Sequence, residues 1–271
     1  MDPTIELGAY LARIGWRGEA AADLATLRGI VASHAAAIPF ENLDPLLGRP
    51  VLLDAEALER KLVRDGRGGY CFEHNLLLSH ALRAIGFEVG WLAARVLWNR
   101  PDDAITARGH MLVRVELDGR THLVDVGFGG LTPTGVLRLE ADVEQSTPHE
   151  PFRLLSIDGD WRMQARVRGD WQTLYRFDLQ RQHQVDYEVT SYYLSTSPTS
   201  HFVTGLIAAR AEPGRRLALR GRDFAVHELD GETTRRTLPT PDEIMAVLES
   251  DFRIRLPDRG ALSARLAALP P

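Results

Sequence analysis

Residues 110–126, HMLVRVELDGRTHLVDV, have the sequence pattern of a β-hairpin. Apolar and polar side chains alternate from residue 111 to residue 117, as they do in a half-buried strand. Asp118-Gly119 signals a two-residue hairpin turn, and residues 121–126 form the predicted return strand. Such a turn pairs residue 117 with residue 120, and it places His110 and Asp125 on one side of the hairpin. The stretch therefore predicts antiparallel β-structure that brings an imidazole close to a carboxylate.

Strand patterns continue on both sides of this hairpin. Short apolar segments rich in β-branched or aromatic residues occur at residues 88–97, 152–155, 161–167 and 171–177. Turn signals stand at Asp158-Gly159 and Gly169-Asp170. Residues 88 to about 180 are therefore predicted to form an antiparallel sheet or a small barrel.

The segments before and after this sheet follow other patterns. Helical spacing marks residues 7–14, 24–31 and 55–63, and a further amphipathic helix begins near Cys71 and stops at Gly86. After residue 180 the predicted elements are a helix at 187–195, strands at 202–209, 215–219, 223–228 and 233–238, and a closing helix at 241–248. The order along the chain is helical, then β, then mixed α and β.

Composition narrows the class of protein. The chain has 271 residues, enough for a substantial core without cross-links, and its formal charge of −5 disfavours a general nucleic-acid binder. The single cysteine, Cys71, excludes an intrachain disulfide and a zinc site built on several cysteines. Lys61 is the only lysine among 32 basic residues, a bias that we attribute mainly to codon usage. No apolar run is long enough for a membrane helix, and residues 1–6 lack the features of a signal peptide, so we expect a cytoplasmic protein with no membrane partner.

Cys71 is the candidate nucleophile. The pair Gly68-Gly69 allows a tight turn before it, and the first turn of a helix offers the sulfur unpaired N–H groups and a positive end, which favour the thiolate. His110 is the candidate base, and Asp125 is the group that orients it. His74 is a rival base, but it lies three residues from the cysteine on the same rigid helix. The structural alternatives are a buried apolar cysteine, a core histidine and an aspartate that caps a strand end.

Four segments together resemble one enzyme family. RGGYCFEHN at 67–75 resembles the cysteine motif of the arylamine N-acetyltransferases, PFENLD at 39–44 their upstream motif, and LVDVGFG at 123–129 their aspartate motif. SPTSHF at 197–202 is similar to a segment before their last domain. The resemblance is to the bacterial type, and the first three motifs occur in the order and with the spacing of that family.

This resemblance implies an α+β fold of three regions: an N-terminal helical bundle at 1–87, a central antiparallel β-barrel at 88–185 and a C-terminal α/β lid at 186–271. It also implies a papain-like catalytic triad of Cys71, His110 and Asp125. The expected reaction is acetyl transfer from acetyl-coenzyme A to arylamines, arylhydrazines or N-hydroxyarylamines. It would follow a ping-pong scheme through an acetyl-cysteine, without a metal.

Further residues acquire expected roles from the same resemblance. An apolar acceptor pocket is expected from Phe40, Phe128 and Phe202. Coenzyme contacts are expected from Trp98, Asn99, Gly127, Gly129 and His227. Glu41 and Arg67 are expected to pair behind the site. Gly109 departs from the family, since bacterial members often carry threonine there, and this puts one hydrogen bond to the coenzyme in doubt.

Three other functions fit part of the pattern. An amide synthase of the same superfamily, which releases a polyketide from a carrier protein as a macrolactam, would use the same triad. A cysteine hydrolase or transglutaminase-like enzyme is chemically compatible, but the flanking motifs do not support it. A non-catalytic binding protein with this fold would carry an ordinary thiol at Cys71. The acceptor amine, the acyl chain and the oligomeric state, a homo-oligomer included, are left open.

Overall fold

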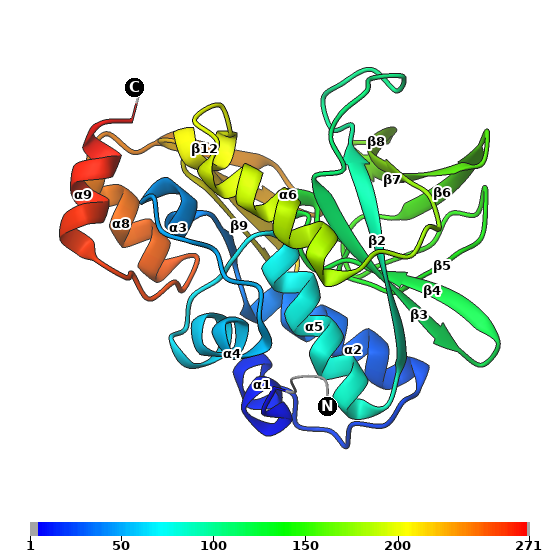
Figure 1. Ribbon diagram of the computed structural model, residues 1–271. Helices are drawn as coiled ribbons and strands as arrows, with labels where there is room; N and C mark the ends of the chain where they lie inside the picture. Colours follow the sequence, from blue (N-terminus) through cyan, green and yellow to red (C-terminus); the bar gives the residue numbers. More distant parts are fainter. Residues whose placement is uncertain (1–4, 270–271) are drawn as a thin grey trace.

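A computed structural model describes residues 5–269, and it confirms the predicted α+β class. Figure 1 shows helices gathered on one side of the molecule and a strongly curved sheet on the other. The helices are α1 (Leu7–Ile14), α2 (Leu24–Ala37), α3 (Leu43–Leu46), α4 (Ala55–Leu58), α5 (Cys71–Ile85), α6 (Gln184–Thr196), α7 (His201–Thr204), α8 (Pro241–Ser250) and α9 (Arg259–Ala267). A π-helical turn, η1 (Glu59–Arg64), extends α4, and a 3-10 turn, η2 (Gly129–Leu131), follows the hairpin.

The strands form two antiparallel sheets. They are β1 (Phe40–Glu41), β2 (Glu88–Val96), β3 (His110–Leu117), β4 (Arg120–Val124), β5 (Leu137–Arg138), β6 (Phe152–Ile157), β7 (Asp160–Val167), β8 (Asp170–Phe177), β9 (Ile207–Glu212), β10 (Arg215–Arg220), β11 (Asp223–Glu228) and β12 (Thr233–Thr237). The seven-stranded sheet has the order β5-β4-β3-β2-β8-β7-β6, and the five-stranded sheet has the order β1-β9-β10-β11-β12.

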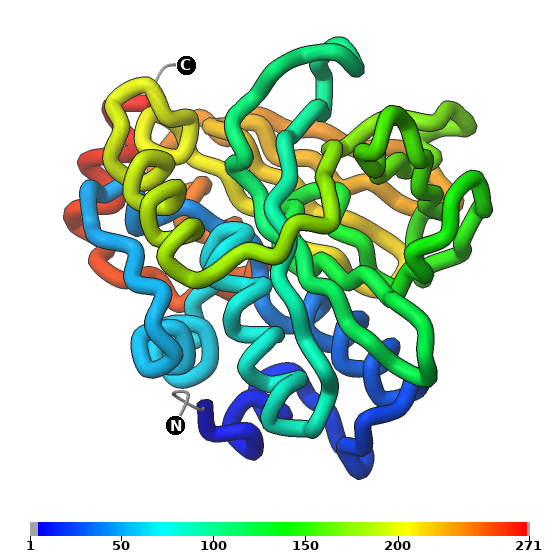
Figure 2. Tube along the Cα trace, turned by 45° about the vertical axis from the view of Figure 1, so that its right-hand side comes forward, coloured from blue at the N-terminus to red at the C-terminus, as the bar shows by residue number. Residues whose placement is uncertain are grey.

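The seven-stranded sheet is a nearly closed barrel. Isolated bridges from Ala141 to Leu154 and from Gln145 to Phe152 connect the chain after β5 to β6, across the gap between the two edge strands. The central hairpin has the predicted register, with Leu117 opposite Arg120. Figure 2 shows the five-stranded sheet passing between this barrel and the helices near the C-terminal end of the chain.

Helix α5 runs through the centre of the helical region. Its residues from Cys71 to Leu82 are all buried, and Leu76, Leu77 and Leu78 have no exposed surface. The helix ends at Gly86, whose left-handed φ of 112° lets its N–H bond to the last turn, as predicted for a glycine stop. Because α5 packs on β2 and β3, the start of the helix is held against the barrel.

Three parts of the chain differ from the sequence-based expectations. The strand predicted over 202–209 is wrong at its start: residues 201–204 form α7, because Ser200 caps this turn by accepting the N–H of Phe202, and β9 begins only at Ile207. Helix α9 was not predicted, although Asp258 caps it and its Leu262 and Leu266 are buried. The helix predicted at 55–63 is α-helical only to Leu58.

Strand β1 comes from the N-terminal part of the chain but pairs with β9, so the helical region and the C-terminal region share a sheet. The division into three regions stays a prediction. Of the residues used to exclude a signal peptide, 1–4 lie outside the described part.

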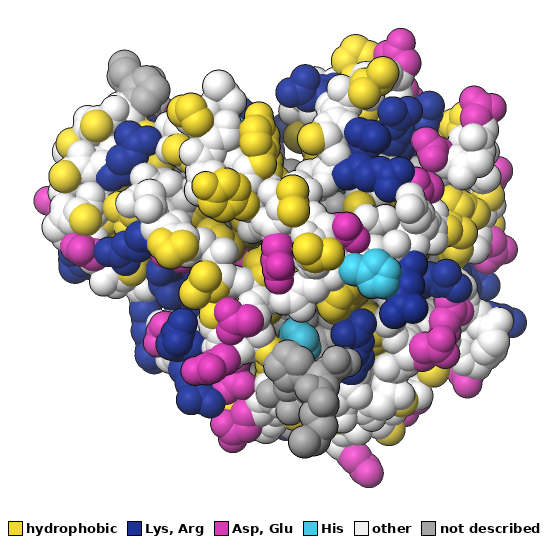
Figure 3. Space-filling model, viewed as in Figure 1, with side chains coloured by type: hydrophobic (Ala, Val, Ile, Leu, Met, Phe, Trp, Pro, Cys, Tyr) yellow, Lys and Arg dark blue, Asp and Glu magenta, His cyan; other side chains and the backbone are white. Residues whose placement is uncertain are grey.

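Helix α6 carries an unusual outer face. Val185, Val189, Tyr192 and Tyr193 are all more than half exposed, and Figure 3 shows apolar side chains gathered over this helix.

Within residues 5–269, none of the helices has the length and apolar character needed to span a bilayer.

Candidate active site

The site is built around the first residue of α5. Cys71 is buried, with 4% of its surface exposed, and it opens the helix directly after the Gly68-Gly69 turn. Glycine is required at this turn because a Cβ on Gly68 would lie 1.9 Å from the carbonyl oxygen of Pro39. The sulfur therefore lies where the first N–H groups of the helix lack partners within the helix.

His110 and Asp125 meet at the end of the hairpin nearest to α5. His110 begins β3, Asp125 follows β4, and Nε2 of His110 donates to Oδ2 of Asp125 at 2.7 Å. Both side chains are almost completely buried. Since Nε2 is bonded to the carboxylate, Nδ1 is the ring nitrogen left to face Cys71.

Asp125 accepts hydrogen bonds on both of its oxygens. Oδ2 also accepts from the hydroxyl of Tyr175 at 3.0 Å, and Oδ1 accepts from the N–H of Gly127 at 3.0 Å and from Nδ2 of Asn75 at 3.1 Å. Asn75 is itself fixed, because it also donates to the carbonyl of Met111 and accepts the N–H of Val126. The carboxylate is thus oriented by the strand, the barrel wall and α5.

Asn75 and Tyr175 also belong to this site, although neither is among the residues predicted from the sequence. Asn75 lies one helical turn after Cys71, so its position on the same face of α5 was a usable signal. Tyr175 lies on β8, two strands away from β3 in the sheet order, and nothing in its local sequence points to Asp125.

The electrostatics of the site favour a charged imidazole. Burial lowers the pKa of His110, but the carboxylate of Asp125 and the hydrogen bond with Cys71 outweigh it and raise the pKa to about 10. Burial raises the pKa of Asp125, and the imidazole together with the hydrogen bonds from Gly127 and Asn75 brings it below its ordinary value. An imidazolium held against a buried carboxylate is suited to stabilise a neighbouring thiolate.

His74, the rival base, belongs to a separate buried chain of hydrogen bonds. Its Nε2 donates to the carbonyl of Pro39 at 3.1 Å, and its Nδ1 accepts from Nε2 of His34 at 3.0 Å. Nδ1 of His34 in turn accepts from the hydroxyl of Tyr10 at 2.9 Å. Burial lowers the pKa of His74 to about 4 and that of His34 well below its ordinary value, so both rings are neutral. His74 therefore has no free nitrogen to offer Cys71.

Aromatic rings flank the imidazole and the helix start. Phe128 meets the His110 ring edge to face with centroids 5.1 Å apart, and the Tyr175 ring lies 4.9 Å from it. Phe40 and Phe202 pack together at 6.2 Å. Neither ring stacks on the Phe128 ring, but Gly129, the residue after Phe128, faces the Phe40 ring. The structure thus places the three expected pocket residues around one loop, Phe128 on the imidazole side and the other two beside it.

The residues expected to contact the coenzyme are spread over three places. Gly127 lies against the cysteine, since a Cβ on it would be 2.7 Å from Cα of Cys71, and Gly129 starts η2 with a φ of 76°. Trp98 and Asn99 follow β2, half-buried and exposed respectively. His227 lies on β11 opposite Arg216, and Arg216 donates to the carbonyl of Gly130 at 3.3 Å, so His227 is one strand away from the glycine loop.

A buried group of charges lies behind the cysteine turn, and we call it the ion cluster: Glu41, Asp44, Lys61, Arg67 and Glu73. The expected pair is confirmed, with Nε of Arg67 donating to Oε1 of Glu41 at 2.8 Å. The cluster extends this pair by three residues that the sequence analysis did not assign.

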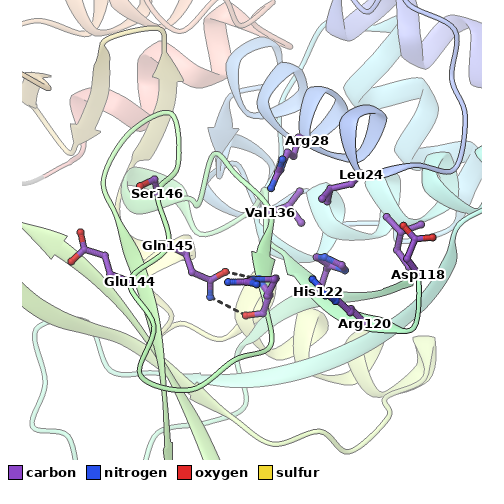
Figure 4. A pocket seen from close by; sticks show the side chains of 11 residues that line it. Leu24, Arg28, Asp118, Arg120, His122, Val136, Glu144, Gln145 and Ser146 are labelled. Carbon is purple, nitrogen blue, oxygen red and sulfur yellow. Dashed lines mark hydrogen bonds between the residues drawn. The ribbon is translucent and has the colours of Figure 1, made fainter.

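A cavity of about 510 Å³ lies away from the predicted site residues, at the far end of the hairpin. Figure 4 shows Arg28, Arg120 and His122 around it, with Gln145 hydrogen-bonded to the backbone of the strand beside it.

No group of three or more potential metal ligands occurs in the described part of the chain.

Comparison with known proteins gives the family. The N-acetyltransferase family model matches residues 23–261. The arylamine N-acetyltransferase of Mycolicibacterium smegmatis is 49% identical over 259 residues, which cover 94% of this chain and 94% of that protein.

Solved structures agree with this. The arylamine N-acetyltransferase of Mycobacterium marinum superposes with a TM-score of 0.94 at 46% identity, covering 96% of this chain and 98% of that one. The same enzyme in complex with CoA superposes with a TM-score of 0.93 at 45% identity, covering 96% of this chain and 98% of that one. On this evidence, the chain belongs to the arylamine N-acetyltransferase family of acetyltransferases.

Proposed function

We propose that this protein transfers an acetyl group from acetyl-coenzyme A to the nitrogen of an arylamine, arylhydrazine or N-hydroxyarylamine through an acetyl-cysteine. One observation carries the proposal: a buried thiol at the start of a helix interacts with an imidazole whose Nε2 is 2.7 Å from a buried carboxylate. The names of the relatives and the M. marinum complex with CoA support the donor and acceptor classes.

The first half-reaction loads the enzyme. Asp125 holds the proton on Nε2 of His110, and Nδ1 takes the proton of the Cys71 thiol. The sulfur attacks the carbonyl carbon of the thioester, and the oxygen becomes an oxyanion that the N–H of Cys71 at the helix start would stabilise. The C–S bond to the coenzyme then breaks, and the imidazolium returns its proton to the leaving thiolate.

The second half-reaction transfers the acetyl group. The amine nitrogen attacks the acetyl carbon bound to Cys71, and His110 takes a proton from the nitrogen as the new C–N bond forms. The C–S bond to the enzyme breaks and leaves the Cys71 thiolate beside the imidazolium. Because free coenzyme leaves before the amine reacts, the scheme is ping-pong.

We assign the substrate contacts as follows. Phe40, Phe128 and Phe202 form the flat apolar surface that suits an aromatic acceptor. Gly127 and Gly129 let the pantetheine arm approach the sulfur, and Trp98, Asn99 and His227 contact the rest of the coenzyme. No resident metal takes part. We place the enzyme in the cytoplasm, as expected from its sequence, and keep the three-region division as part of the proposal.

The test is a screen of acyl donors and amines with the wild type and Cys71→Ala. We expect the wild type to release about one equivalent of coenzyme A per enzyme from acetyl-coenzyme A alone, and to release it continuously only when a simple arylamine or hydrazine is present. The variant should release none. The amide synthase alternative predicts no turnover of acetyl-coenzyme A with simple arylamines, and turnover of long acyl chains on a phosphopantetheine arm. Turnover by the Cys71→Ala variant would refute the covalent scheme.

A further inference from the structure

Lys61 stands out because arginine occupies all other basic positions of this chain. A bias towards arginine explains the other positions, but it does not explain why one lysine is retained. Lys61 also lies in η1, where the backbone leaves the α-helical path for a π-helical turn. Such turns are frequent at functional sites, because the extra residue redirects one side chain.

The turn directs Lys61 inwards, into the ion cluster. Its ammonium lies 2.6 Å from Oδ2 of Asp44 and 2.6 Å from Oε1 of Glu73. Burial lowers the pKa of Lys61, but the carboxylates of Glu73, Glu41 and Asp44 outweigh it, and the pKa ends above its ordinary value. The lysine is therefore charged and joins two carboxylates that come from different segments of the chain.

Glu73 connects this contact to the reactive cysteine. It lies two residues after Cys71 in the first turn of α5, and its Oε2 accepts the N–H of Tyr70, the residue that precedes the helix, at 3.0 Å. The same carboxylate fills the space beside Gly69, where a Cβ would lie 2.6 Å from Oε2. One oxygen of Glu73 thus fixes the backbone on which Cys71 sits, and the other oxygen is held by Lys61.

The charge count of the ion cluster shows what the ammonium does. Three carboxylates (Glu41, Asp44 and Glu73) share two cations, Lys61 and Arg67. Burial raises the pKa of Glu73 even with the lysine in place. Without the ammonium, a buried carboxyl group would take up a proton, because an unpaired charge is too costly to bury. A neutral Glu73 would accept the Tyr70 N–H more weakly than a carboxylate does.

We propose that Lys61 is a positioning residue for the nucleophile: its ammonium keeps Glu73 ionised and bound to the Tyr70 N–H, which fixes the first turn of α5 around the Cys71 sulfur. This inference rests on the proposed function only in taking Cys71 as the reacting group. We expect a guanidinium to replace the ammonium only in part, because it is longer and planar and would have to fit the space that the smaller ammonium fills between the two carboxylates.

The test measures the rate at which iodoacetamide alkylates Cys71 between pH 5 and 9. This readout needs neither an acetyl donor nor an amine, so it separates this proposal from the proposed function. The variants are Lys61→Met, Lys61→Arg and the double variant Lys61→Met with Glu73→Gln. The matched control is Arg60→Met, which removes a cation from the neighbouring exposed position.

We expect iodoacetamide to alkylate Cys71 about tenfold more slowly at pH 7 in Lys61→Met than in the wild type. The pH at which the alkylation rate is half-maximal should rise by about one unit, because one charge-assisted hydrogen bond is lost. Lys61→Arg should lose about threefold. The double variant should regain part of the rate, because a glutamine oxygen accepts the Tyr70 N–H at every pH without a buried charge, although more weakly than a carboxylate does. Arg60→Met should alkylate like the wild type.

Three results would overturn the proposal. They are a wild-type pH profile in Lys61→Met, a double variant no faster than Lys61→Met, and a loss in Arg60→Met equal to that in Lys61→Met. If Lys61→Met does not fold, the test depends on the double variant and on Lys61→Arg. A wild-type alkylation rate in Lys61→Arg would then contradict the positioning role of Lys61.

Discussion

Replacing Asp125 with asparagine gives the sharpest prediction for the site. All four groups that contact the carboxylate donate to it: the His110 ring, the Tyr175 hydroxyl, the Asn75 amide and the Gly127 N–H. An asparagine side chain has one oxygen that accepts and one NH2 group that donates. Its NH2 group must therefore face groups that also donate. Asn75 cannot turn to accommodate it without losing its bonds to Met111 and Val126.

The asparagine is therefore expected to direct its amide at Nε2 of His110. The ring must then carry its proton on Nδ1, which leaves no nitrogen free to take the thiol proton. The variant also loses the charge that, with Cys71, moves the pKa of His110 from 6.5 to about 10. Since one pKa unit corresponds to about 1.4 kcal/mol, several kcal/mol of imidazolium stabilisation depend on these interactions. We expect kcat/KM to fall by about 10³- to 10⁴-fold.

The assay follows coenzyme A release with acetyl-coenzyme A and an arylamine, together with the pH profile of Cys71 alkylation. The control is Asp118→Asn, the same substitution at the exposed turn of the same hairpin, where φ is 51° and asparagine is well tolerated. Asp118→Asn should retain wild-type kinetics. An Asp125→Asn enzyme within tenfold of the wild type would refute the role given to the carboxylate.

Three further predictions concern packing and pH. Gly127→Ala should abolish acetyl transfer, because its Cβ would lie 2.7 Å from Cα of Cys71, whereas Gly130→Ala meets nothing within 4 Å and should be active; equal activities would contradict this. Arg67→Leu leaves the Glu41 carboxylate buried without its cation and should lower the free energy of unfolding in urea by about 3 to 5 kcal/mol; a loss below about 1 kcal/mol would count against the pair. The pKa of His74 falls to about 4 on folding, so below pH 6.5 the unfolded chain binds more protons than the folded chain does. The contribution of His74 to the free energy of unfolding should therefore be complete above pH 6.5 and should fall by up to about 1.4 kcal/mol per pH unit towards pH 4. His74→Gln should show a shallower slope in the same titration, and an unchanged slope would exclude His74 as the source.

Much of the fold could be predicted because local signals and tertiary packing agree. The two-residue turn at Asp118-Gly119 determined the register of the central hairpin, and Gly86 marked the end of α5. The start of β9 was mispredicted because β-branched and aromatic residues favour a strand, while the Ser200 cap stabilises a helical turn there. Helix α9 was missed although Asp258 is a recognisable cap.

The candidate site could be predicted only where its residues are near in sequence or share a hairpin. His110 and Asp125 follow from the hairpin register, and Cys71 follows from its place at a helix start. The contact of Tyr175 with Asp125 depends on the order of strands in the barrel, which local patterns do not encode. Of the five residues in the ion cluster, only Glu41 and Arg67 were predicted. Lys61 lies in a π-helical turn at residues 59–64, which the sequence pattern does not indicate.

The most direct test of the central claim is the mass of the protein after it is mixed with acetyl-coenzyme A and quenched in acid. We expect one acetyl group to be added, peptide mapping to place it on Cys71, and an arylamine to remove it as the acetylated amine. An enzyme that turns over these substrates with no acetyl group on Cys71, or with the label on another residue, would contradict the acetyl-cysteine mechanism.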